Sequence, residues 1–179
     1  MIRTIVTFGV VAGLIVAVPM FVMLALMRLD PAAMAGSQAL GYALMLAAFS
    51  LIVVAVKRHR DRAPSGAIAF WPAFAIGLAI SAVASVVYVV GWEITLAVSG
   101  MDFIGAYAEA SLQAARAKGA SEAEIARLSA DMAAFSAQYA NPLFRLPITF
   151  IEIFPIGAVV SLIAALVLRN PRVWPARTR

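Results

Sequence analysis

Two carboxylates lie inside apolar stretches of the sequence, where an ionisable side chain is costly and is usually kept for a function. Glu93 lies in the stretch 70–98 and Glu152 in the stretch 146–168. If both stretches cross a bilayer as helices of opposite direction, the two carboxylates lie at a similar depth in the same half. Carboxylates in contact cannot both stay ionised, which would permit proton exchange. The pair is one candidate site for a small oligomeric proton- or cation-coupled carrier.

Local partners give a simpler interpretation of the same carboxylates. Arg145 is seven residues before Glu152 and shares its helical face, and Thr149 lies one turn away. Helical phase points both glutamates away from the small-residue faces of their helices. If those faces pack together, the glutamates do not meet. We therefore favour an intramembrane polar site of Glu93, Glu152, Arg145 and Thr149 in which each carboxylate is satisfied by a nearby side chain or water.

The densest run of charge is Lys57-Arg58-His59-Arg60-Asp61-Arg62, between the apolar stretches 39–56 and 70–98. Basic residues at span ends resist translocation, so the run predicts a cytoplasmic hairpin turn. We expect its four cations to contact lipid headgroups, namely Lys57, Arg58, Arg60 and Arg62. The more specific alternative is that these residues bind a particular phosphorylated lipid or ligand.

These residues belong to a strongly apolar chain. Of its 179 residues, 64% are hydrophobic and 13% are charged, and the mean hydropathy is +0.95. Soluble domains have about 25% charged residues. Four stretches approach or exceed the roughly 20 helical residues that cross a bilayer, at about 5–27, 39–56, 70–98 and 146–168. The sequence predicts an all-α membrane protein, a four-transmembrane-helix bundle that forms one membrane domain over residues 1–179.

The segment 101–141 is predicted to form a helical periplasmic hairpin between the third and fourth spans. Asp102 can cap a helix that runs to Ala117, and Ser121 and Glu124 form a capping box for a second helix. The apolar residues of the second helix make a single stripe: Ile125, Leu128, Met132, Phe135 and Tyr139. This stripe can pack on the bundle, the bilayer surface or a partner. We expect it to lie over the outer end of the bundle, because the charged residues of this helix are mostly acidic and would not be attracted to anionic lipid.

Small residues recur every four positions in three spans and predict close helix contacts. The sets are Gly9, Gly13 and Ala17; Ala73, Gly77, Ser81 and Ser85; and Gly157, Ser161 and Ala165.

The orientation of the spans in the membrane is predicted from the 14 basic residues. Nine share one side in a four-span topology: Arg3, the four cations of the run, Arg169, Arg172, Arg177 and Arg179. The other five are Arg28, Arg116, Lys118, Arg127 and Arg145. Both termini are predicted to be cytoplasmic.

Several functional classes find no support in the sequence. There is no cysteine, and the single histidine, His59, lies in the basic run, so no disulfide framework or Cys-ligated metal is expected. No catalytic, phosphate-binding or dinucleotide motif occurs, so we expect neither enzyme activity nor a cofactor. The basic residues lie at span ends rather than among aromatic residues, which argues against nucleic acid as a partner.

The stretch 48–93, with its basic run, Phe70, Gly77 and the segment 88–93, resembles a family of small bacterial four-span membrane proteins. The segments 141–144, 152–157 and 161–163 carry the same resemblance. This family is catalogued as a domain of unknown function (number 4199), and the resemblance covers nearly the whole chain. It implies a four-span fold in a bacterial inner membrane, and it implies no activity, ligand or catalytic residue.

The leading hypothesis is therefore a structural or accessory membrane subunit that acts through contacts with helices and lipids. Its partners would be membrane lipids and a membrane protein or further copies of the chain. The alternative is the carrier that uses Glu93 and Glu152. The two hypotheses differ in the surroundings of these carboxylates, because a carrier needs them to line a cavity.

Overall fold

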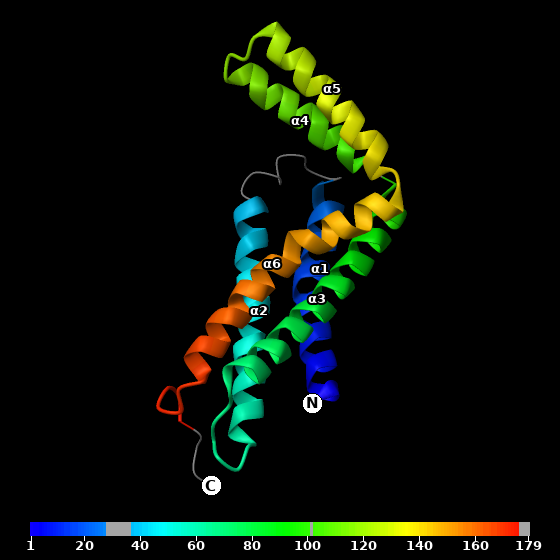
Figure 1. The fold of residues 1–179 in the computed structure, drawn as a ribbon. Helices are drawn as coiled ribbons and strands as arrows, with labels where there is room; N and C mark the ends of the chain where they lie inside the picture. The colour runs from blue at the N-terminus through cyan, green and yellow to red at the C-terminus, as the bar shows by residue number, and fades with distance from the viewer. Residues whose placement is uncertain (28–36, 101, 176–179) are drawn as a thin grey trace.

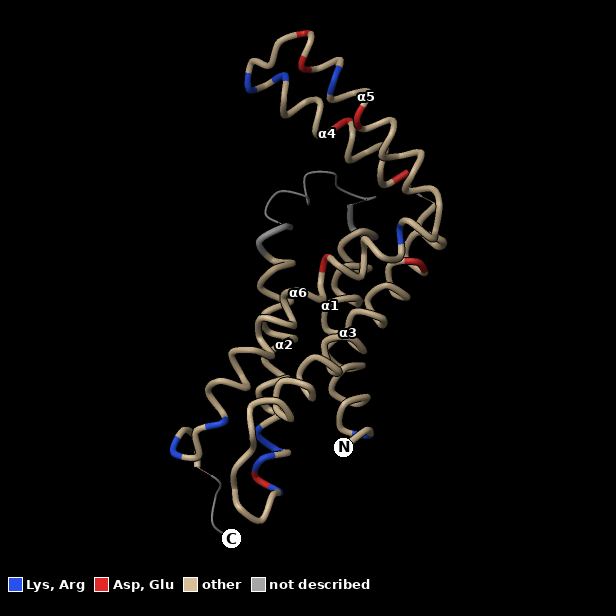
Figure 2. The backbone as a smooth tube through the Cα atoms, in the orientation of Figure 1, with Lys and Arg blue, Asp and Glu red and all other residues tan. Residues whose placement is uncertain are grey.

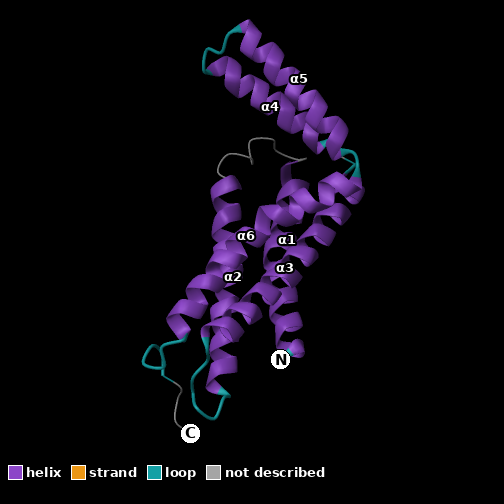
Figure 3. Ribbon diagram, viewed as in Figure 1, coloured by secondary structure: helices purple, strands orange, loops and turns teal. Residues whose placement is uncertain are grey.

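The computed structural model describes residues 1–27, 37–100 and 102–175. All regular structure in these ranges is helical (Figure 3). The six helices are α1 (Ile2–Met27), α2 (Ser37–Asp61), α3 (Phe70–Ser99), α4 (Phe103–Ala117), α5 (Glu122–Tyr139) and α6 (Pro142–Leu168). Four of them, α1, α2, α3 and α6, are long and apolar enough to cross a membrane. The predicted all-α fold with four long apolar helices is confirmed.

Two predicted helix boundaries need correction. Helix α2 does not end before the basic run but continues through it to Asp61, so the turn to α3 lies at 62–69. Basic side chains in the last turn favour this extension, because they offset the negative end of the helix dipole. Helix α6 begins at Pro142 rather than near 146, with Asn141 as its N-cap accepting a 3.0 Å hydrogen bond from the Leu143 amide.

Helix α3 is the centre of the bundle, packing against both α1 and α6, and α2 packs against the same two helices. The N-terminus, the α2–α3 turn and the C-terminal end of α6 lie at one end of the bundle, which we call the basic end (Figure 1). The α4–α5 hairpin lies at the opposite end, the hairpin end. Charged residues gather towards the two ends, and most of the length between them has none (Figure 2). Arg28, Arg177 and Arg179 lie outside the described residues.

The contact between α3 and α6 is made by small residues that were predicted to form close helix contacts. A Cβ atom placed on Gly77 would come within 2.6 Å of the Ser161 Cβ, and one on Gly157 within 2.7 Å of the Ser81 Cβ. The two serine Oγ atoms are 3.3 Å apart. Each hydroxyl donates within its own helix, Ser81 to the Gly77 carbonyl and Ser161 to the Gly157 carbonyl. This α3–α6 seam therefore combines close backbone approach with satisfied polar groups.

Helix α1 meets α3 in the same manner. A Cβ on Gly9 would come within 2.6 Å of the Val83 Cβ, and one on Gly13 within 2.6 Å of the Val87 Cβ. On α3, Gly91 in turn faces Ala17 of α1. The predicted small-residue step of α1 thus contacts α3, which meets it with Val83, Val87 and Gly91 rather than with its own predicted small residues.

The hairpin helices have the predicted caps. The Asp102 carboxylate accepts from the Gly105 amide at 2.8 Å, and Gly119 takes the left-handed conformation, with φ of 79°, between the helices. Ser121 and Glu124 form the full capping box. The Ser121 amide and hydroxyl both donate to the Glu124 carboxylate, and these two bonds lower the pKa of Glu124. The α5 N-terminus is therefore stabilised best when Glu124 is ionised.

The expectation that α5 covers the outer end of the bundle is wrong. The hairpin projects away from the spans (Figure 1), and α5 packs against α4 and meets the bundle through its link to α6. Within the stripe, Ile125 and Tyr139 are buried and the other three residues are half-buried. Helix α4 can bury them because it carries apolar residues of its own, including the buried Ile104.

The α3–α6 seam gives a test of the fold. We expect Gly77→Ala to lower the free energy of unfolding by about 1–3 kcal/mol, because the added methyl group overpacks the contact with Ser161. Gly41→Ala is the matched control, since a Cβ there meets no atom of the described chain within 4 Å. It should leave stability unchanged or raise it by up to about 1 kcal/mol. Both values follow from SDS-induced unfolding in mixed micelles, and equal behaviour of the two variants would contradict the seam.

Candidate functional site

At the hairpin end, an ion pair joins α3 to α6. The Arg145 Nε donates to Glu93 Oε1 at 2.7 Å, and its Nη2 donates to Glu93 Oε2 at 2.6 Å. The pair is bidentate, the geometry in which a guanidinium and a carboxylate fit best. The side chains are 16% and 31% exposed, so this polar contact is only partly open to its surroundings.

The same arginine holds the last residue of α5. Its Nη1 donates to the Tyr139 carbonyl at 3.2 Å, and its guanidinium lies 5.7 Å from the centroid of the Tyr139 ring. From α3, the Trp92 Nε1 donates to the Tyr139 hydroxyl at 2.7 Å. Tyr139 is therefore bound at its backbone, its ring and its hydroxyl, which ties the base of the hairpin to two spans. We call Trp92, Glu93, Tyr139 and Arg145 the hairpin-end cluster.

Helix electrostatics explain why Arg145 needs a carboxylate. Arg145 lies in the first turn of α6, where the positive end of the helix dipole disfavours a cation. Glu93 supplies a negative charge beside both the cation and this helix end. The contact can therefore be understood as a structural pairing of charges, and it does not require that Glu93 exchange protons.

The predicted polar site is divided by the structure. Glu93 and Arg145 come together, and the Thr149 hydroxyl donates to the Arg145 carbonyl at 3.0 Å. Glu152 joins neither of them. Its side chain is exposed on α6 and makes no hydrogen bond or ion pair with any residue that the structure describes. The prediction that Arg145 is the partner of Glu152 is therefore wrong. The two residues are seven positions apart on α6, but the Arg145 guanidinium binds Glu93 of α3 instead.

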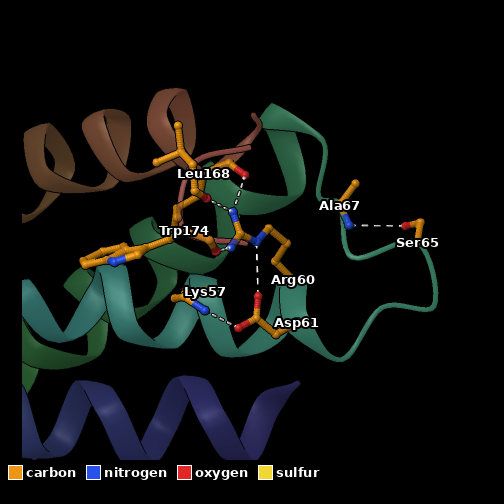
Figure 4. Close-up of polar contacts among 8 residues, drawn as sticks. Lys57, Arg60, Asp61, Ser65, Ala67, Leu168 and Trp174 are labelled. Atoms are coloured by element: carbon orange, nitrogen blue, oxygen red, sulfur yellow. Dashed lines mark hydrogen bonds and ion pairs between the residues drawn. The ribbon is translucent and has the colours of Figure 1, made fainter. Parts of the chain in front are cut away.

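At the basic end, Arg60 is fully buried, with 0% exposure. Its Nη1 donates to the carbonyls of Leu168 at 3.4 Å and Val173 at 2.8 Å, and its Nη2 donates to the Trp174 carbonyl (Figure 4). Its Nε pairs with Asp61 at 3.2 Å. Arg60 thereby links the end of α2 to the end of α6 and to the segment that follows it.

The expected headgroup contacts divide in a similar way. The prediction that Arg60 contacts a lipid headgroup is wrong, because its guanidinium is buried and bound to three carbonyls. Lys57 is half-buried and forms an ion pair with Asp61, one turn along α2. Arg58 and Arg62 are exposed, and the Arg58 guanidinium lies 5.5 Å from the centroid of the Phe8 ring of α1.

Sequence reasoning missed two polar roles. The sequence pattern placed Tyr139 in an apolar stripe and indicated no polar role for Trp92, yet both residues are buried and hydrogen-bonded to each other. A buried Trp or Tyr usually needs a partner for its polar atom. This rule could have predicted a hydrogen bond between Trp92 and Tyr139. Within the described ranges, no three acidic or histidine side chains gather in a way that could hold a metal ion.

The fold and these contacts define a helical protein with four long apolar helices and a polar cluster at each end of α6. Residues 7–170 match the family described as "Protein of unknown function (DUF4199)", and the chain belongs to that family. This confirms the resemblance found in the sequence. No curated protein and no solved structure matches the chain.

The ion pair predicts that the two carboxylates respond differently to the same change. We expect Glu93→Gln to lower the free energy of unfolding by about 1 kcal/mol, because it leaves the Arg145 cation without a counter-charge in a half-buried position. Glu152→Gln is the control and should change it by less than about 0.5 kcal/mol, since Glu152 has no described bond to lose. SDS unfolding measures both. Equal losses would refute the division of the site.

Proposed function

We propose that the protein is a structural or accessory subunit of a membrane complex, acting through helix and lipid contacts and without catalytic activity of its own. One observation carries the proposal: Glu152 lies exposed on α6 in the apolar length of the bundle. Its exposed neighbours include Ile151 at 63% and Val159 at 55%. An ionised side chain at the bilayer centre costs about 3 kcal/mol or more, so such residues usually face a polar partner.

We infer that Glu152 takes its partner from outside the chain, because no described residue binds it. Arg145 is committed to Glu93, and the Thr149 hydroxyl to a backbone carbonyl. A second membrane protein, or a further copy of this chain, would supply the donor and cover the apolar residues around Glu152. This is the kind of contact by which an accessory subunit joins a complex.

The carrier hypothesis has less support. It requires Glu93 and Glu152 to line one pathway, whereas Glu93 is bound bidentately by Arg145 and Glu152 lies on an exposed surface. Further towards the basic end, the α3–α6 seam is closed by Gly77, Gly157 and their serine neighbours. A transport cycle would have to break the ion pair and open this seam.

Purification of the native complex tests the proposal. We expect the protein to leave the membrane in mild detergent with a stoichiometric membrane protein, or as a defined oligomer. Glu152→Leu should abolish that association, because it removes the acceptor that the partner binds, while Glu109→Leu on the hairpin should not. If the protein purifies alone, moves protons in liposomes and stops with Glu152→Gln, the accessory role is wrong and the carrier is right.

We further propose that this membrane is the inner membrane of a bacterium, with the basic end in the cytoplasm and the hairpin in the periplasm. The proposal rests on the nine basic residues assigned to the basic side against five on the other. A reporter that is active only in the periplasm should be active when inserted at Gly119 and inactive when fused after Arg179. Equal activity at the two positions would refute the orientation.

A further inference from the structure

Four arginines at the basic end are exposed and come from two segments that are far apart in sequence. Arg58 lies in the last turn of α2 and Arg62 directly after it, and Arg169 and Arg172 lie just after α6. None of the four takes part in an ion pair with another described residue. Asp61, the carboxylate beside them, is already bound by Lys57 and Arg60. Their charges are therefore available to an anion from outside the chain.

Arg60 brings the two segments together. It is buried, it belongs to α2, and it binds the carbonyls of Leu168, Val173 and Trp174. Because these carbonyls point inward to Arg60, the segment after α6 folds back beside the end of α2 (Figure 4). Trp174 has a left-handed backbone, with φ of 53°, and its indole is left exposed, at 62%.

We propose that Arg58, Arg62, Arg169, Arg172 and Trp174 form one surface for the headgroups of anionic phospholipids, and that Arg60 is its positioning residue. Guanidinium groups bind phosphate oxygens in pairs. Exposed tryptophan is characteristic of the membrane interface, and the surface lies where four apolar helices end. A second tryptophan, Trp71, is 73% exposed and lies in the first turn of α3 at this same end.

This inference rests on the proposed role through lipid contacts, but it fails or succeeds independently of any protein partner. Phosphate chemistry alone would also attract a soluble phosphate, so the experiment has to separate the two sources. The hairpin provides a matched control because it carries three exposed basic residues at the far end of the molecule, namely Arg116, Lys118 and Arg127.

The test uses the full-length protein in detergent with phosphatidylglycerol, phosphatidylcholine or inorganic phosphate. We expect bound lipid, measured by native mass spectrometry, to be enriched in phosphatidylglycerol, and thermal unfolding to shift upward with that lipid alone. Each arginine changed to Gln should lower the enrichment by about fivefold, and the fourfold variant should lose it. The variant with Gln at the three hairpin positions should keep it.

Other outcomes overturn the proposal. If the fourfold variant keeps its preference for phosphatidylglycerol, or the hairpin variant loses as much, the surface is not the binding site. If inorganic phosphate gives the same shift, the ligand is soluble phosphate and not lipid. Arg60→Met tests positioning: we expect the enrichment to fall while the helical content by circular dichroism stays unchanged. Unchanged enrichment in that variant would show that Arg60 does not organise the surface.

Discussion

The rest of the structure depends on close backbone contact between α3 and α6. In a bilayer, lipid tails are as apolar as leucine, so burial of apolar surface does not drive spans together, and tight packing has to do so. Gly77 and Gly157 allow the approach, and Ser81 and Ser161 fill the space with hydroxyls that bond within their own helices. Because α1 packs on α3, and α2 packs on α1, α3 and α6, each of the other two spans contacts at least one of the helices that this seam joins.

An arginine fastens α6 at each end, and the two arginines meet opposite electrostatic conditions. At the C-terminal end, Arg60 approaches the Leu168 carbonyl, which lies at the negative end of the α6 dipole, so its charge is favourable there. At the N-terminal end, Arg145 meets the positive end and needs Glu93 as a counter-charge. The second contact also holds Tyr139, so the direction in which the hairpin leaves the bundle depends on an ion pair between two spans.

Features encoded by local periodicity were predictable, and features that depend on tertiary placement were not. The capping box of Ser121, the small-residue faces and the apolar lengths follow from residues a few positions apart. The pairing of Arg145 with Glu93 joins residues 52 positions apart, and helical phase alone offered Glu152 instead. Arg60 looked like any other cation of its run, because only the return of the segment after α6 buries it.

Glu152 differs from Glu93 and Arg145, the charged groups nearest to it in the spans, because no described residue accounts for it. Glu93 is explained by Arg145, and Arg145 by Glu93 and the Tyr139 carbonyl. Glu152 has no such partner among the described residues, although both ends of the same helix are held by arginine contacts. A bilayer penalises an unpaired carboxylate far more than water does. Glu152 is therefore a charge on the exposed surface of α6 that the contacts among the described residues do not satisfy.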